Sequence, residues 1–150
     1  MRISVDETDV PSAMKGAWHV DAHVGPLSMR LNASDLVSAV FFLRVDKLAR
    51  DDELKTLVGK FYVEEVVDTP EGSHVLLRTN GPGLVSRFGL TVTQVDGDRW
   101  IATLHNSVHP RSWIGRLYFR LIEPFHHLLM EHVALLRLAG RAAGRGGIGK

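Results

Sequence analysis

The chain has 150 residues, of which 45% are hydrophobic and 23% are charged, and it contains no cysteine. This length and composition indicate one globular domain rather than a disordered chain, and the lack of cysteine excludes disulfides, thiolate metal sites and a cysteine nucleophile. The acidic N-terminus and the short apolar runs predict neither a signal peptide nor a transmembrane helix, so we expect a cytoplasmic protein without membrane insertion.

The net charge of +1 conceals an asymmetry along the chain. Residues 1–75 carry 8 Lys and Arg against 13 Asp and Glu, a balance of −5, whereas residues 76–150 carry 10 against 4, a balance of +6. The arginines of the second half are mostly scattered singly, and no basic run alternates with aromatic residues. The electrostatic footprint of a nucleic-acid-binding protein is therefore missing, and we expect no nucleic-acid partner.

The first part of the chain predicts one strand and two helices. Residues 17–24 alternate in polarity and predict a strand, which the following Gly-Pro pair would end. Residues 32–44 predict a helix with an Asn or Ser cap, although their β-branched and aromatic side chains also allow a strand. Residues 51–58 are acidic at their start and are followed by a glycine, so they predict a second short helix.

From residue 60 onward the polarity alternates with a period of two. Segments separated by turn residues predict antiparallel strands over residues 60–68, 73–79, 84–95 and 99–108. Sequential antiparallel strands followed by a helix predict an α+β fold in which a helix covers one face of the sheet.

The longest apolar pattern in the chain runs from Ser112 to about Gly140. Its apolar residues recur at steps of three and four and predict an amphipathic helix that packs into a curved sheet; they include Ile114, Leu117, Tyr118, Leu121 and Phe125. Pro124 predicts a kink near Arg120 or Leu121, or a split into two helices. The Gly- and Arg-rich residues 141–150 predict a disordered tail after a single domain over residues 1–140.

Two short motifs in this region resemble a known family. They are Gly115-Arg116-Leu117-Tyr118-Phe119 and Glu123-Pro124-Phe125-His126. The second half of the chain resembles a bacterial START-like family of unknown function, whose members occur alone or joined to short-chain-dehydrogenase-like NAD-binding domains. Phe119 stands where that family favours Trp. The resemblance implies the helix-grip fold, in which a curved antiparallel sheet surrounds a long C-terminal helix and a ligand cavity lies between them.

The predicted strands carry polar residues that could line such a cavity. Ile101, Thr103 and His105 share one face of the last strand, and if that face looks inward they would lie beside Tyr118. An inward ionisable group could then act as an acid or a base. The candidate acid–base residues are His105, Tyr118 and Arg87, and the candidate ligand contacts are Thr103, Ile101, Arg78, Leu121 and Phe125. The alternative, that the strand residues face solvent, stays open.

No metal or cofactor is predicted. Glu123 and His126 have the Glu-x-x-His spacing of di-metal helical bundles, but the second such pair and the further glutamates are missing. Glu123, His127 and Glu131 share one helical face, which is more typical of a solvated polar face than of a metal site.

Two main functional hypotheses follow. The first is a binding module that holds a small hydrophobic or aromatic molecule between the sheet and the C-terminal helix. The second is a cofactor-free cyclase, dehydratase or isomerase acting on a polyketide-like substrate. A buried polar cluster on the inner face would favour the enzyme, and an all-apolar lining would favour the binding module. A third possibility is an interaction domain that pairs through its sheet edge, and an oligomer is allowed.

Overall fold

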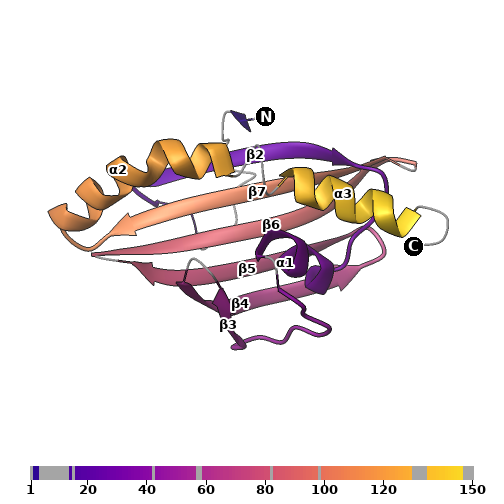
Figure 1. Ribbon diagram of the computed structural model, residues 1–150, viewed down its shortest axis with the longest axis horizontal. Coiled ribbons are helices and arrows are strands. Elements are labelled where there is room, and N and C mark those ends of the chain that lie inside the picture. The colour runs from indigo at the N-terminus through magenta and orange to yellow at the C-terminus, as the bar shows by residue number, and fades with distance from the viewer. Residues whose placement is uncertain are drawn as a thin grey trace.

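The computed structural model describes residues 2–3, 14, 16–41, 43–56, 59–81, 83–97, 99–129 and 135–146. Its elements in chain order are β1 (Arg2–Ile3), β2 (His19–Leu27), α1 (Ala33–Phe41), β3 (Glu53–Thr56), β4 (Gly59–Thr69), β5 (Gly72–Gly81), β6 (Leu84–Asp96), β7 (Arg99–Pro110), α2 (Trp113–Leu129) and α3 (Leu135–Gly146). The strands form one seven-stranded sheet in the order β1-β2-β7-β6-β5-β4-β3 (Figure 1).

All neighbouring strands in the sheet are antiparallel. Strands β4 to β7 follow each other as a meander, which confirms the α+β class and the strands predicted between residues 60 and 108. β2 then pairs with the last strand of the meander, from His19 opposite Val108 to Leu27 opposite Trp100. This register decides which residues of β2 share a face with which residues of β7, because directly opposite residues point to the same side.

The main core lies between one face of the sheet and the helices α1 and α3, which pass over that face (Figure 1). Ala102 and Leu104 of β7 are buried there with Leu36 of α1 and Leu138 of α3. A methyl group added at Gly25 of β2 would lie 3.1 Å from the Leu135 side chain of α3, so β2 presents the same face to α3. We call this face the inner face of the sheet.

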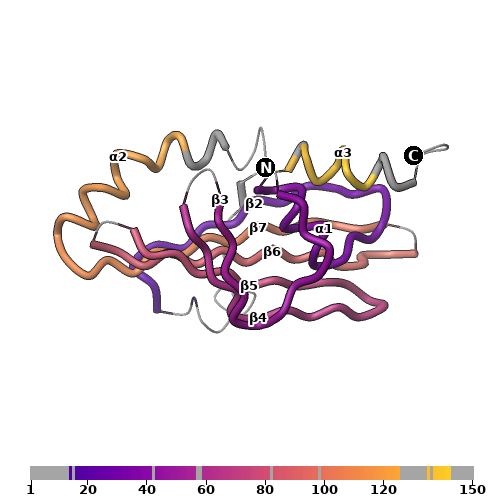
Figure 2. Tube along the Cα trace, turned by 60° about the horizontal axis from the view of Figure 1, so that its bottom comes forward, coloured from indigo at the N-terminus to yellow at the C-terminus, as the bar shows by residue number. Residues whose placement is uncertain are grey.

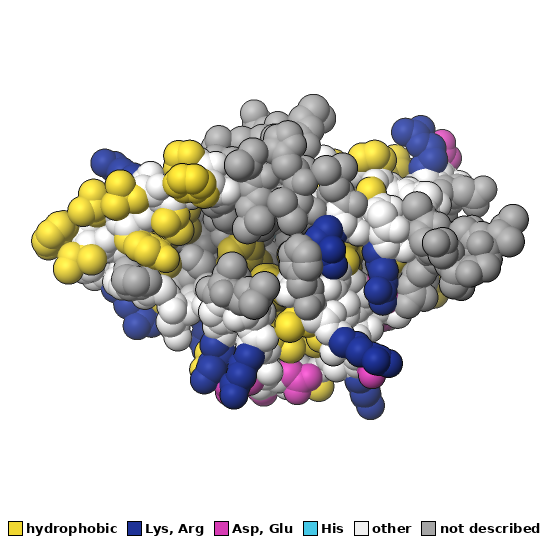
Figure 3. Space-filling view, in the orientation of Figure 1, with side chains coloured by type: hydrophobic (Ala, Val, Ile, Leu, Met, Phe, Trp, Pro, Cys, Tyr) yellow, Lys and Arg dark blue, Asp and Glu magenta, His cyan; other side chains and the backbone are white. Residues whose placement is uncertain are grey.

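Over Trp113–Phe125, where its side chains are described, helix α2 meets the sheet through a narrow side. Gly115 and Phe119 are its buried positions among the side chains described, and Phe119 packs with Leu84 and Val108. The other large apolar side chains described in α2 are exposed, namely Trp113, Ile114, Leu117, Tyr118, Leu121, Ile122 and Phe125. They form the hydrophobic surface at one end of the molecule (Figure 3). In the described part of α2, the apolar face predicted to pack into the sheet therefore points away from it.

The start of α2 is fixed by a close approach of two glycines. The backbone amide of Arg111 donates to the carbonyl oxygen of Gly83 over 2.7 Å. A side chain at Gly115 would overlap that same carbonyl, and Gly83 itself has a φ of +67°. Glycine at both positions lets the first turn of α2 lie directly on the turn between β5 and β6.

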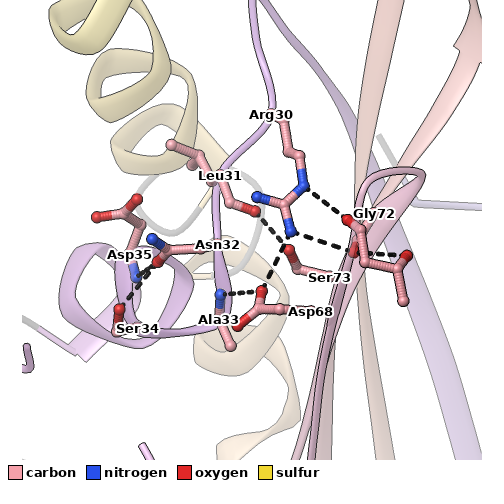
Figure 4. A network of polar contacts seen from close by, with 10 residues as sticks. Arg30, Leu31, Asn32, Ala33, Ser34, Asp35, Asp68, Gly72 and Ser73 are labelled. Carbon is pink, nitrogen blue, oxygen red and sulfur yellow. Dashed lines mark hydrogen bonds and ion pairs between the residues drawn. The ribbon is translucent and has the colours of Figure 1, made fainter. Parts of the chain in front are cut away.

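Helix α1 is fixed to the hairpin of β4 and β5 by a polar network (Figure 4). Asn32 caps the helix, since its Oδ1 accepts from the Asp35 amide over 2.9 Å, which confirms one of the two predicted caps. The Asp68 carboxylate accepts from the Ala33 amide, also over 2.9 Å. The Ser73 hydroxyl donates to the Leu31 carbonyl over 2.8 Å. The first two bonds satisfy amides at the helix start that would otherwise lack partners, and the third satisfies the Leu31 carbonyl.

The predicted helix over residues 51–58 is wrong, because Glu53–Thr56 is strand β3. It pairs with the first residues of β4, from Glu53 opposite Tyr62 to Thr56 opposite Gly59. The pairing continues beyond the strand, since the Asp51 amide donates to the Val63 carbonyl over 2.7 Å. A four-residue segment gains more hydrogen bonds by pairing with an adjacent strand than by forming a single helical turn. The acidic residues at the start of this segment thus precede a strand and do not cap a helix.

The predicted end of β2 is also wrong, because the strand continues through Gly25 and Pro26 to Leu27. Pro26 lacks an amide hydrogen and is tolerated on a strand side that needs no ladder bond. In the described part of the chain, β1 pairs only with His23 and Ala22, so no strand lies beside Pro26 on that side.

The C-terminal region differs from the prediction in two ways. α2 runs through Pro124 to Leu129 and α3 begins at Leu135, so the helix does not end at Pro124. The kink near Arg120 or Leu121 stays a prediction. The predicted disordered tail starts too early, because residues 141–146 belong to α3. Ala142 is buried, and the Arg141 guanidinium pairs with Asp35 of α1 over 3.1 Å. Residues 147–150 lie outside the described residues. Figure 2 shows α2 and α3 along one side of the sheet.

Replacing Gly115 by Ala should lower the free energy of unfolding by about 1–3 kcal/mol, because the new methyl group displaces α2 from the Gly83 carbonyl. Gly140→Ala is the matched control, since a side chain there meets nothing within 4 Å. Alanine in a helix should leave stability unchanged or raise it by up to about 1 kcal/mol. Urea denaturation of both variants tests this. Equal stabilities would show that the glycine contact does not position α2.

His74 of β5 predicts a pH dependence of stability. Burial lowers the pKa of His74 from its ordinary value of 6.5, and the Glu65 carboxylate raises it in part. Below about pH 6.5 the unfolded chain therefore binds more protons than the folded protein. The free energy of unfolding should decrease as the pH falls from about 6.5 towards the lower pKa of His74 in the folded protein. His74→Gln should flatten the curve of unfolding free energy against pH in this window. An unchanged slope would contradict the assignment.

Candidate functional site

The strand residues predicted from sequence lie on the outer face, opposite the core. His105 is flanked across the strands by Ala22 and Gly89, and Thr103 by Val24 and Thr91. Their neighbours in the chain, Ala102 and Leu104, are the inward residues. The condition under which Ile101, Thr103 and His105 would line an inner site is therefore not met.

The two predicted arginines also lie on the outer face, where Arg78 and Arg87 stand opposite each other. The Arg87 Nε donates to the Glu64 carboxylate over 2.8 Å, and the Arg78 guanidinium lies 5.5 Å from the centre of the Tyr62 ring. Both side chains have local partners on that face.

The predicted residues of the C-terminal helix lie apart from the strand residues. Tyr118, Leu121 and Phe125 are 37%, 66% and 72% exposed on the outer side of α2. The eight predicted site residues are thus distributed over two separate surfaces, and the structure does not bring them together as one site.

A polar row on the inner face of β2 is a stronger candidate. His19, Asp21 and His23 alternate along the strand and stand opposite Val108, Asn106 and Leu104 of β7. Since Leu104 belongs to the core, the whole row points inward. Asp21 and His23 are each 1% exposed. We call His19, Asp21 and His23 the β2 row.

One carboxylate lies between the two imidazoles of the β2 row. The His19 Nε2 is 2.8 Å from Asp21 Oδ2, and the His23 Nδ1 is 3.6 Å from Asp21 Oδ1. A carboxylate oxygen only accepts, so the His19 Nε2 carries the hydrogen of this bond. The other nitrogen of a neutral His19, Nδ1, then carries a lone pair. It lies 3.8 Å from Glu123 Oε2, beyond hydrogen-bond distance.

The β2 row joins two apolar clusters. At one end, His19 packs against Phe119 of α2 with ring centroids 4.6 Å apart, and Phe119 meets Trp18 edge-on at 5.8 Å. At the other end, His23 stands beside Leu104 of the main core. Asn106 lies between these ends, opposite both Asp21 and Phe88. The row is therefore a polar band set between aromatic and aliphatic side chains.

Asn106 has hydrogen-bonding capacity left over. It is 3% exposed, and its Oδ1 has no hydrogen-bond partner among the residues that the structure describes. A buried amide oxygen normally accepts a hydrogen bond, and an unmet one favours a site that a donor can occupy.

Sequence reasoning recognised the strand at residues 17–24 but assigned it no chemistry. The pattern His19-x-Asp21-x-His23 places three titratable groups on one side, whereas Val20 and Ala22 alternate on the other. The polar residues on one side of this predicted strand are all titratable, and this feature could have identified the site.

No metal site is found among the residues described, since no group of three or more His, Asp or Glu side chains there is arranged to hold an ion. The side chains of His127 and Glu131, which share a predicted helical face with Glu123, lie outside the described residues. Within the described part of the chain, no helix is both long and apolar enough to cross a membrane.

Comparisons with known proteins establish the family. Residues 6–133 match the family described as "Protein of unknown function (DUF2867)". The chain belongs to this family. The family description names no fold, so the START-like helix-grip resemblance stays a prediction beside the observed antiparallel sheet. No curated protein shows a significant match to the chain.

Two solved structures are similar to this member of the DUF2867 family. A hypothetical protein from Helicobacter pylori, jhp0584, has a TM-score of 0.62 at 12% identity, covering 93% of this chain and 98% of that one. At this identity the likeness shows a common fold alone. A norcoclaurine synthase point mutant from Thalictrum, solved with a transition-state analogue, has a TM-score of 0.48 at 12% identity, covering 86% of this chain and 96% of that one. This second likeness is too weak to support an inference.

Phe119 should matter more for stability than the exposed aromatic residues of α2. Phe119→Ala removes a side chain that is 3% exposed and contacts His19, so we expect a loss of about 3–5 kcal/mol in the free energy of unfolding. Phe125→Ala, at a side chain that is 72% exposed, is the matched control and should change it by no more than about 0.5 kcal/mol. Thermal and urea denaturation measure both. A larger loss for Phe125→Ala would contradict the placement of α2.

Proposed function

We propose that the protein binds a small, largely apolar or aromatic molecule on the inner face of the sheet, with a polar group of that molecule at the β2 row. The observation that carries this proposal is the buried carboxylate of Asp21 between two imidazoles, set in a surrounding of aromatic and aliphatic side chains. Polar groups at such a position orient a ligand whose remaining surface is apolar.

The row offers chemically distinct contacts for such a ligand. His19, whose side chain is 19% exposed, is the member of the row that solvent reaches, and its Nδ1 accepts a proton or a hydrogen bond. Asn106 offers an amide oxygen opposite Asp21. The ring of Phe119 packs on His19 and in turn meets Trp18 edge-on, so both rings provide aromatic surface near the row. A hydroxylated aromatic or polyketide-like molecule matches this combination of acceptors and rings.

Proton transfer is the second candidate function, and the 2.8 Å bond between His19 and Asp21 favours it. A carboxylate that accepts from one imidazole nitrogen fixes the tautomer and orientation of the ring, which leaves the other nitrogen as a base. Such a base supports a cofactor-free isomerisation, dehydration or cyclisation, in which His19 removes a proton from the substrate and returns it at another atom. A buried polar group on the inner face was the feature expected to favour an enzyme over a binding module.

Native mass spectrometry of freshly purified protein, followed by denaturing extraction, tests the binding proposal. We expect a co-purified small molecule, or a complex with the fluorescent probe anilinonaphthalene sulfonate. His19→Gln should weaken that complex about tenfold or more, because a buried hydrogen bond to a titratable group is lost. Loss of turnover with binding retained in His19→Gln would assign the row to proton transfer.

His74→Gln is the matched control, because His74 is another partly buried histidine bonded to a side chain, at 3.0 Å from Thr91, and it lies on the opposite face of the sheet. It should leave binding unchanged. A wild-type protein that carries no small molecule and binds no aromatic probe would contradict the proposal. Equal weakening in the two variants would show that the ligand does not contact the β2 row.

A further inference from the structure

The exposed side of α2 has the features of an interaction surface. Its apolar residues occupy positions 113, 114, 117, 118, 121, 122 and 125, a repeat that covers about half of the helix circumference at 100° per residue. Trp113 is 71% exposed and Leu121 is 66% exposed. Large apolar side chains are rarely left in water in such a contiguous group. We call these seven residues the α2 patch.

The fully exposed charged residues along α2 and at its start are arginines. Arg111, Arg116 and Arg120 are all exposed and flank the patch. Glu123 is the one acidic residue between Arg111 and Phe125, and its carboxylate is 3.8 Å from His19 on the inward side of the helix. The exposed part of α2 therefore combines apolar side chains with an arginine rim.

The shape of this region is convex. α2 lies at one end of the long axis of the molecule, and the α2 patch covers the tip there (Figures 1 and 3). An amphipathic helix exposed in this way can lie in the plane of a bilayer interface with its apolar side in the headgroup and acyl-chain boundary. Aromatic side chains such as Trp113 and Tyr118 are favoured at the boundary between headgroups and acyl chains, and arginines beside them attract anionic headgroups.

We propose that the α2 patch docks the protein on an anionic lipid surface, with α2 lying in the plane of the headgroups. A second copy of the chain fits the charges less well. In a two-fold symmetric contact each helix packs against its own copy, so the three exposed arginines of one copy would lie near those of the other. An anionic bilayer complements both features of this surface, since its acyl chains accept the apolar side chains and its headgroups carry negative charge opposite the arginines. The docking needs no membrane-spanning helix.

Co-sedimentation with vesicles tests the proposal. The wild-type protein should bind vesicles made of equal parts phosphatidylglycerol and phosphatidylcholine, bind phosphatidylcholine vesicles much more weakly, and lose binding as salt is added. The double variant Leu117→Gln and Leu121→Gln should lose at least about tenfold in affinity for these vesicles, because it removes two apolar side chains that would insert into the bilayer. Arg116→Gln should bind anionic vesicles about fivefold more weakly.

The matched control is the double variant Val67→Gln and Val95→Gln, which changes two exposed apolar side chains of the strands, 41% and 51% exposed. It should bind like the wild type. Melting curves of all variants should coincide with that of the wild type, since the changed side chains are exposed. Absence of vesicle binding by the wild type, or equal binding by both double variants, would overturn the proposal. Sedimentation of the wild type as a dimer that Leu117→Gln and Leu121→Gln dissociates, without vesicle binding, would show that a second copy covers the α2 patch.

Discussion

The arrangement of the inner face depends on how the Asp21 carboxylate is accommodated. An ionised carboxylate removed from water costs several kcal/mol unless hydrogen-bond donors and positive charge surround it. His19 and His23 stand two residues away on either side, so the β-strand itself places both imidazoles beside the carboxylate, at 2.8 and 3.6 Å. This polar band divides the inner face: the main core under α1 and α3 lies on one side, and the Leu84, Val108 and Phe119 cluster under α2 on the other.

Helix α2 connects this interior to the surface. Its buried side brings Phe119 against the His19 ring and Glu123 to 3.8 Å from the same imidazole. Its other side carries the α2 patch. A molecule or surface that shifts α2 therefore acts directly on the part of the β2 row that solvent reaches. The contact between Gly83 and Gly115 limits this motion at the start of the helix, because no side chain separates the two backbones.

Local rules predicted the elements whose ends are marked by turn chemistry. The meander from residue 60 follows from its turns and its two-residue period, and α1 follows from the Asn32 cap. The facing of the strands could not be predicted, because a shift of one residue exchanges His105 for Leu104 on the inner face. Likewise, the periodicity of α2 reveals an apolar face but not what covers it. The role of Asp21 could not be predicted because it depends on the burial of its carboxylate. That burial depends on the pairing of β2 with a strand about 80 residues away.

The most direct test of the β2 row as the ligand site is nitrogen NMR of the histidine imidazoles, recorded with and without the co-purified molecule or anilinonaphthalene sulfonate. If the row contacts the ligand, the resonances of His19 and His23 shift on binding and those of His74, on the opposite face, do not. The account would be contradicted if the ligand binds while the His19 and His23 resonances stay unchanged.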